Sequence, residues 1–151
     1  MPDWRRIHEK FEDKELTIVT KLPRQAVYIW SDGRHLYRVI ENLYNNVAKY
    51  ALQKTRVYVE VQADEERAVF SIKNVSARSL ARENSEVEDL TERFIRGDSS
   101  RTTEGSGLGL SIAKNLTLLM GGMFDISVDG DLFKATIALP LYVEGQEERG
   151  Q

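Results

Sequence analysis

The chain is organised around Glu104-Gly105-Ser106-Gly107-Leu108-Gly109-Leu110-Ser111-Ile112-Ala113-Lys114. Three glycines stand at alternate positions, and an apolar run with helical spacing follows them directly. Glycine lets a ligand approach the backbone closely, and the first turn of a helix offers unpaired N–H groups and the positive end of the helix dipole. The stretch therefore indicates a phosphate-binding loop. A flexible loop that happens to precede a helix would have the same composition, so the rest of the chain must separate the two interpretations.

The overall composition is that of one globular domain. The chain has 151 residues, of which 41% are hydrophobic and 30% charged, with a formal net charge of -3. This size allows a single core, and the negative charge disfavours non-specific binding to nucleic acid. The absence of cysteine excludes disulfides, thiol catalysis and cysteine-ligated metal sites. With His8 and His35 as the only histidines, a histidine-rich metal site is not expected. No apolar run reaches the length of a membrane span.

Apolar spacing and turn residues predict helices that alternate with paired strands. Strands are expected over residues 16–20, 27–30, 56–63, 68–74, 124–128 and 133–139, and helices over residues 33–52 and 108–119, with a short helix or irregular lead-in over residues 3–13. This order favours an α/β (α+β) two-layer sandwich, in which a mixed, mostly antiparallel sheet is covered on one face by helices. The polar connection 76–104 is long for a compact domain, which indicates a functional loop or lid.

A polar stripe runs beside the apolar stripe of the helix predicted over residues 33–52. On a helix of 3.6 residues per turn, Asn42, Asn46, Lys49 and Tyr50 fall within about 100° of one another. An amide oxygen suits Mg²⁺, a lysine gives a phosphate a point charge, and a tyrosine ring can cover an adenine. A solvated helix face is the alternative, but the glycine-rich run later in the chain favours a nucleotide site.

Three motifs resemble the boxes of bacterial sensor histidine kinases. Residues 32–51 resemble the N box, Leu90-Thr91-Glu92-Arg93-Phe94-Ile95-Arg96-Gly97-Asp98 the F box, and Gly105-Ser106-Gly107-Leu108-Gly109-Leu110 the G2 box. The resemblance implies the catalytic, ATP-binding domain of such a kinase over residues 1–143, with residues 76–104 as the ATP lid and residues 144–151 as a solvated tail. It also implies the Bergerat fold of the GHKL superfamily, which is shared with DNA gyrase and MutL.

The resemblance assigns roles to individual residues. Asn46 would hold Mg²⁺, Asn42 would line the same site, and Arg96 would reach the γ-phosphate from the lid. The residues implied to contact ATP are Asn46, Lys49, Tyr50, Asn74, Arg96, Arg101, Gly105, Gly107, Leu108 and Gly109. Those implied in catalysis are Asn42, Asn46 and Arg96. For Arg101, a solvated loop position is an equal alternative to a phosphate contact.

The G1 box is where this chain departs from the family's pattern. The family has an Asp followed by glycines, and the Asp accepts a hydrogen bond from the adenine amino group. Here that place holds Asn74-Val75-Ser76-Ala77. An Asn oxygen still accepts a hydrogen bond, but without charge assistance, so adenine binding is expected to be weakened. The alternative is that Asn74 is only a turn residue at the end of a strand.

The first position of the polar stripe favours phosphoryl transfer over hydrolysis. Hydrolysing relatives place a Glu four residues before the Mg²⁺-binding Asn, whereas here that residue is Asn42, whose amide cannot take a proton from water. The resemblance implies as acceptor a histidine on a dimerisation and phosphoacceptor domain that this chain lacks. His8 begins a similar motif but without its continuation, and is expected to be a surface histidine.

The expected context is a longer, membrane-anchored sensor that acts as a homodimer and passes its phosphoryl group to a response regulator. This chain would be its cytoplasmic catalytic domain, monomeric by itself, with ATP and Mg²⁺ as cofactors and no nucleic-acid partner. Two alternatives stay open. One is a hydrolytic GHKL ATPase, and the other is a degenerate, non-catalytic nucleotide-binding or interaction domain whose altered G1 box has lost function.

Overall fold

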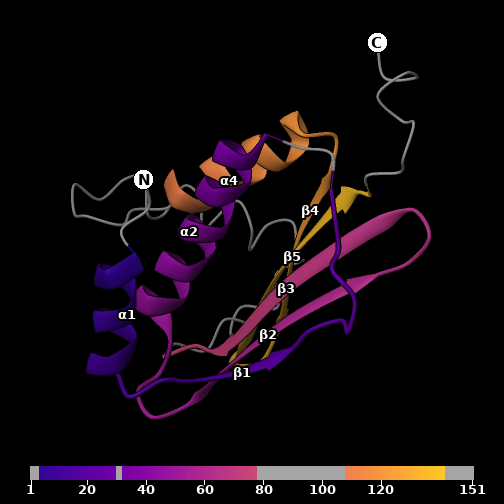
Figure 1. Ribbon diagram of the computed structural model, residues 1–151. Coiled ribbons are helices and arrows are strands. Elements are labelled where there is room, and N and C mark those ends of the chain that lie inside the picture. The colour runs from indigo at the N-terminus through magenta and orange to yellow at the C-terminus, as the bar shows by residue number, and fades with distance from the viewer. Residues whose placement is uncertain (1–3, 30–31, 78–107, 142–151) are drawn as a thin grey trace.

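A sheet and a layer of helices on one of its faces make up the computed structural model, which describes residues 4–29, 32–77 and 108–141 (Figure 1). The helices are α1 (Trp4–Asp13), α2 (Gly33–Tyr50) and α4 (Leu108–Leu119). The strands are β1 (Thr17–Lys21), β2 (Arg56–Ala63), β3 (Arg67–Val75), β4 (Met123–Asp129) and β5 (Leu132–Pro140).

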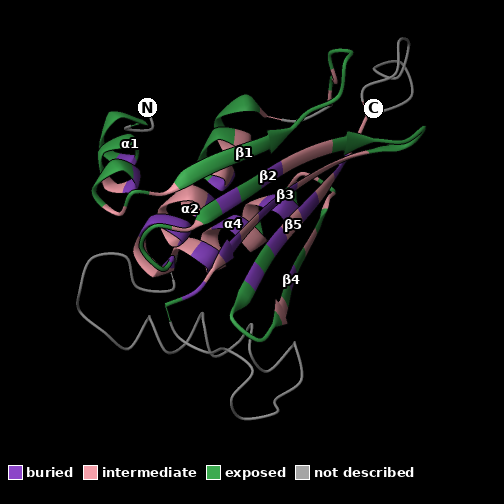
Figure 2. Ribbon diagram, turned by 90° about the horizontal axis from the view of Figure 1, so that it is seen from below, coloured by how far each residue is buried: buried purple, intermediate pink, exposed green. Residues whose placement is uncertain are grey.

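The sheet has the order β1-β2-β3-β5-β4. Its only parallel pair among the described strands is β1 with β2, and the other neighbours are antiparallel. The two predicted hairpins, β2–β3 and β4–β5, supply the antiparallel pairs. The predicted fold class, a mixed and mostly antiparallel sheet with helices on one face, is therefore confirmed. Figure 2 shows that burial increases from the exposed edge strand β1 toward the central strands.

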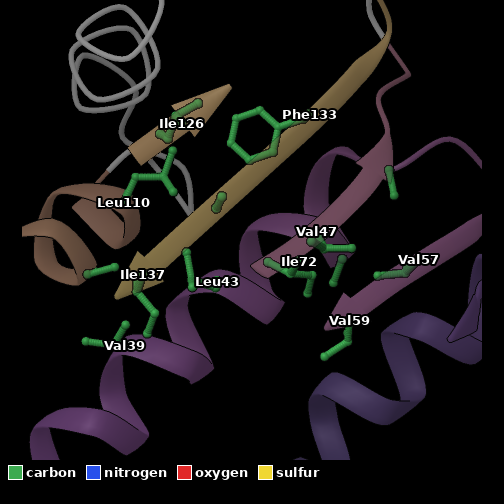
Figure 3. Close-up of a cluster of buried hydrophobic side chains, with 14 of the residues drawn as sticks. Val39, Leu43, Val47, Val57, Val59, Ile72, Leu110, Ile126, Phe133 and Ile137 are labelled. Carbon is green, nitrogen blue, oxygen red and sulfur yellow. The ribbon is translucent and has the colours of Figure 1, made fainter. Parts of the chain in front are cut away.

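The core lies between the inner face of the sheet and the apolar stripe of α2. Figure 3 shows buried side chains from both layers meeting there. The contributing residues include Val39, Leu43 and Val47 of α2, Leu110 of α4, and Val57, Val59, Ile72, Ile126, Phe133 and Ile137 of the strands. Residues of β2, β3, β4 and β5 face this core at alternate positions, because successive side chains of a strand point to opposite faces of the sheet, whereas all five residues of β1 are exposed. Burial of this apolar surface is the main favourable contribution to folding.

The end of α4 is fixed by backbone geometry at two consecutive glycines. Gly121 has φ +77, and its N–H donates to the Leu118 carbonyl at 3.0 Å, while the Gly122 N–H donates to the Thr117 carbonyl at 2.9 Å. This is the hydrogen-bond pattern of a Schellman cap, which needs a left-handed residue at Gly121. A Cβ on Gly122 would collide with the Ala138 carbonyl oxygen of β5. Both glycines are thus required where the sequence predicted the helix to stop.

One predicted strand is wrong. Residues 27–30 form no strand over the described part, Val27 to Ile29, which makes a single antiparallel bridge from Ile29 to Leu141. Pro140, beside that bridge, has no N–H with which to extend a ladder. Tyr28 is 68% exposed, so its ring is not buried against the sheet. The segment instead links β1 to α2.

Other boundaries agree with the predictions more closely. Asp32 caps α2 by accepting a hydrogen bond from the Arg34 N–H at 2.8 Å, as expected for an N-cap residue. The helix ends at Tyr50, two residues before the predicted end. Of the predicted lid 76–104, residues 78–104 lie outside the described residues, as does the predicted tail 144–151. Within the described ranges, no helix combines the length and apolar character that crossing a bilayer requires.

Candidate functional site

The polar stripe of α2 lies at the boundary between the core and the surface. Asn42, Asn46, Lys49 and Tyr50 are each half-buried, whereas Val47 on the adjacent face is buried. The predicted angular grouping of the four polar residues is therefore matched by a common degree of burial. A flank of this kind can present amide oxygens and a cation to a ligand while the apolar stripe holds the helix to the sheet.

Asn42 brings the stripe into contact with the first turn of α4. Its Nδ2 donates to the Arg38 carbonyl oxygen at 2.8 Å. A Cβ placed on Gly109 would lie 3.2 Å from the Asn42 Oδ1, which is tighter than an ordinary contact. Glycine at position 109 therefore lets α4 begin directly against α2. Gly109 thus stands beside Asn42 in the first turn of α4, which begins at Leu108, and the sequence predicted this helix N-terminus as a phosphate site.

The opposite end of the stripe is tied to the end of β3. The Ala77 N–H donates to the Tyr50 carbonyl at 2.9 Å, and the Leu52 N–H donates to the Val75 carbonyl at 2.8 Å. The Lys49 ammonium lies 5.0 Å from the centre of the Tyr50 ring, a cation–π arrangement. These contacts hold Lys49 and Tyr50 next to the strand that carries Asn74.

Lys14 supports the same end of α2, a role that the sequence did not predict. Its Nζ donates to the Lys49 carbonyl at 2.9 Å and to the Ala51 carbonyl at 3.0 Å. A cation at the C-terminus of a helix satisfies carbonyls that have no partner in the helix and opposes the dipole. Burial lowers the pKa of Lys14. Nothing local in the sequence connects residue 14 with residues 49 and 51.

Asn74 is buried and lacks any hydrogen bond. Only 2% of its surface is exposed, and neither its Oδ1 nor its Nδ2 has a partner in the part of the chain that the structure describes. It shares the helix-facing side of β3 with Ile72, two residues away. Its cross-strand neighbours are Val57 on β2 and Phe133 on β5. A turn residue would use its amide on nearby backbone, so that alternative does not fit.

The unpaired amide carries a cost that a ligand could relieve. A buried polar group without a partner costs about 1–3 kcal/mol, and native structures keep few such groups. In this apolar surrounding, the Asn74 amide offers one acceptor oxygen and two donor hydrogens, which can pair with a polar substituent of a planar heterocycle. Asn74, at the predicted base-contacting position, therefore suits the base of a nucleotide on grounds of burial and chemistry.

The phosphate-side residues are only partly described. Arg96, Arg101, Gly105 and Gly107 lie outside the described residues, so their roles stay predictions. In the described ranges, no group of three or more His, Cys, Asp or Glu residues could hold a metal ion. The amide oxygen of Asn46 is of the hard oxygen type that Mg²⁺ prefers.

Neither histidine belongs to the polar stripe of α2. The His8 Nε2 lies 2.9 Å from Oε1 of Glu12, one turn along the exposed face of α1. His8 is therefore a surface histidine, as predicted. His35 is half-buried in the first turn of α2.

Comparisons with known proteins give a consistent result. The sequence profile described as "Histidine kinase-, DNA gyrase B-, and HSP90-like ATPase" matches residues 31–143. The sensor histidine kinase WalK of Bacillus subtilis is 29% identical over 143 residues, which are 93% of this chain and 23% of WalK. The mycobacterial sensor histidine kinase MprB is 25% identical in its solved structure, with TM-score 0.68 and 91% of each chain covered.

A further solved structure supports the fold alone. The catalytic domain of histidine kinase ThkA has TM-score 0.72 at 17% identity, and the match covers 91% of this chain and 88% of that one. The chain spans about a quarter of the length of the curated relatives it matches.

Proposed function

Because the chain belongs to the family of histidine kinase-, DNA gyrase B- and HSP90-like ATPases, we propose that it binds ATP with Mg²⁺ along the polar flank of α2. The protein to which it belongs would transfer the γ-phosphoryl group to a histidine, as expected of the sensor histidine kinases that the chain resembles. Residues 1–143 would form the catalytic domain, with residues 76–104 as the lid over the nucleotide and residues 144–151 as a solvated tail.

The observation that carries this proposal is the unpaired amide of Asn74. It is buried on the helix-facing side of β3, where neither of its polar atoms meets a partner among the described residues. A group of this kind lowers the stability of the free domain, and the amino group of adenine would satisfy its Oδ1. The base would then lie at the end of α2 that carries Tyr50.

The phosphates would lie at the other end of the stripe, where Asn42 meets the first turn of α4. From Asn42 to Tyr50 the helix rises about 12 Å at 1.5 Å per residue, a distance that a nucleoside triphosphate can span. Asn46 stands midway, one turn from each end, and its oxygen is the proposed ligand of Mg²⁺. Leu108 and Gly109 would offer backbone N–H groups to the phosphates, as would Gly105 and Gly107.

The residues of the stripe favour transfer over hydrolysis. In the transfer, a nitrogen of the acceptor histidine bonds to the γ-phosphorus as the bond to the β–γ bridging oxygen breaks, and ADP leaves with that oxygen. Asn42 cannot deprotonate water, and its Nδ2 is bonded to the Arg38 carbonyl. When bound, Mg²⁺ would neutralise charge on the phosphates. Arg96 would approach the γ-phosphate, with Arg101 as a second cation.

The partners follow from the same proposal. The acceptor histidine would stand on a dimerisation and phosphoacceptor domain outside this chain, in a homodimeric sensor anchored in a membrane. A response regulator would receive the phosphoryl group. The catalytic domain would be cytoplasmic and monomeric by itself, without a nucleic-acid partner.

Calorimetric titration of the chain with a non-hydrolysable ATP analogue, with and without Mg²⁺, tests the proposal. Binding with a Mg²⁺-dependent component is expected. Asn46→Ala should remove that component, because it deletes the proposed ligand oxygen, whereas Asn115→Ala at an exposed position of α4 is the matched control and should retain it. Absence of binding at millimolar nucleotide would refute the proposal and favour the degenerate alternative.

A further inference from the structure

We infer that Asn74 lets the base site accept purines with either an amino or a keto group at carbon 6, so that adenine and hypoxanthine nucleotides bind about equally. The inference rests on the proposed function, because it concerns the base of the nucleotide placed there. The inference goes beyond the proposed function by assigning the specificity for the base to one residue of this chain.

The first step is that nothing in the described residues fixes the orientation of the Asn74 amide. Both the oxygen and the nitrogen of the side chain are buried without partners. If a protein donor held the Oδ1, or a protein acceptor held the Nδ2, one orientation would be favoured before a ligand arrived. The amide can therefore turn by 180° and keep its planar shape in the space it already occupies.

The second step is the hydrogen-bonding capacity of an amide. An Asn side chain carries an acceptor and two donors, whereas an ionised Asp carries acceptors alone. A 6-amino purine would donate to the Oδ1 of Asn74. A 6-keto purine would accept from its Nδ2 after the amide turns. A carboxylate at this position could serve the first base but would face the keto oxygen of the second with an unpaired negative charge.

The third step is the apolar setting of the residue. Val57 and Phe133 are the cross-strand neighbours of Asn74, and both are buried. Neither side chain can hydrogen-bond, so neither can discriminate between an amino and a keto group. Among these neighbours, discrimination at carbon 6 therefore depends on Asn74.

Three triphosphates separate this inference from its alternatives. ATP has an amino group at carbon 6, inosine triphosphate a keto group, and purine riboside triphosphate hydrogen. We expect the affinities of ATP and inosine triphosphate to agree within about fivefold, and purine riboside triphosphate to bind about threefold to tenfold more weakly than both, since it lacks one hydrogen bond. Competition against a fluorescent ATP analogue on the full chain measures all three.

Asn74→Asp supplies the comparison with a carboxylate. In this variant inosine triphosphate should bind about 10–100-fold more weakly than ATP, because a charged acceptor pairs with the amino group alone. The ratios for the unsubstituted chain stand even if this variant folds poorly.

The outcomes separate the two levels of the proposal. If ATP binds but inosine triphosphate is rejected tenfold or more, the inference is wrong and the proposed function stands. Equal binding of all three triphosphates also overturns it, because Asn74 would then not contact carbon 6. If none of the triphosphates binds, the proposed function fails, and the inference fails with it.

Discussion

Replacing Asn74 by Leu should change stability and nucleotide affinity in opposite directions. Leu has the same branching as Asn but no polar atoms. The substitution removes a buried amide whose oxygen and nitrogen have no partners in the described structure. Removing an unsatisfied buried group stabilises the chain by about 1–3 kcal/mol. The methyl groups of Leu are larger than the amide atoms of Asn, and overfilling of the site offsets part of this gain. We expect a net stabilisation of about 1–2 kcal/mol, or roughly 2–8 °C in Tm.

The affinity of the same variant for nucleotide should fall. Without the amide, the polar substituent of the base would be buried with no partner, which we expect to weaken ATP binding about tenfold or more. Urea denaturation of the free chain gives the stability, provided that the slope of the transition is unchanged. Calorimetric titration with the ATP analogue gives the affinity.

Thr117 provides the matched control. It is also fully buried, but its hydroxyl donates to the Ala113 carbonyl at 2.7 Å. Thr117→Val removes a bond that is made, so we expect a loss of about 0.5–1.5 kcal/mol. If Asn74→Leu instead destabilised the chain and left ATP affinity unchanged, Asn74 would be a structural residue and the reasoning would be refuted.

Three further predictions test the site and its supports. Gly109→Ala should destabilise the chain, since a Cβ there would lie 3.2 Å from the Asn42 Oδ1, and a second substitution, Asn42→Ala, should relieve this crowding. Urea denaturation of the single and double variants should give a coupling energy of about 1 kcal/mol. Simple additivity of the two effects would contradict the contact. Gly122→Ala should cost about 1–3 kcal/mol in a thermal melt, because its Cβ would collide with β5. Gly33→Ala, with open space around it, should be nearly neutral, and equal effects of the two substitutions would argue against the packing of Gly122 on β5. Hydrogen bonds from two backbone N–H groups hold the pKa of Asp64 below its ordinary value. The contribution of Asp64 to folding stability is therefore complete above about pH 4 and is lost as the pH falls through the lowered pKa. The stability difference between the parent and Asp64→Ala should shrink in acid, and a difference that grew there would contradict the lowered pKa.

Local patterns in the sequence were sufficient for most of the fold. The apolar stripe of α2 was predicted because it repeats with helical spacing, and the end of α4 because only glycine suits the backbone there. Three motifs carry the resemblance to the family, and the match over residues 31–143 confirms it. In each case the signal is carried by residues near one another along the chain.

The predictions failed where the outcome depends on distant residues. Residues 27–30 have the composition of a strand, but their described part makes a single bridge, from Ile29 to Leu141 far along the chain, next to Pro140, which has no N–H to donate. The bonds from Lys14 to the end of α2 join residues 35 and 37 positions apart. The contact of Asn42 with Gly109 was likewise not foreseen, although each residue was singled out by itself. Tertiary packing, which no local pattern reports, decided all three.

The most direct test of nucleotide binding follows the Asn74 side-chain amide by NMR. Its signal can be identified as the one that is absent from the spectrum of Asn74→Leu. Adding ATP with Mg²⁺ should shift this signal, and adenosine alone at higher concentration should shift it in the same direction, while inorganic tripolyphosphate should leave it in place. A signal that stays unmoved at saturating ATP would contradict a base site at Asn74 and with it the proposed placement of the nucleotide along α2.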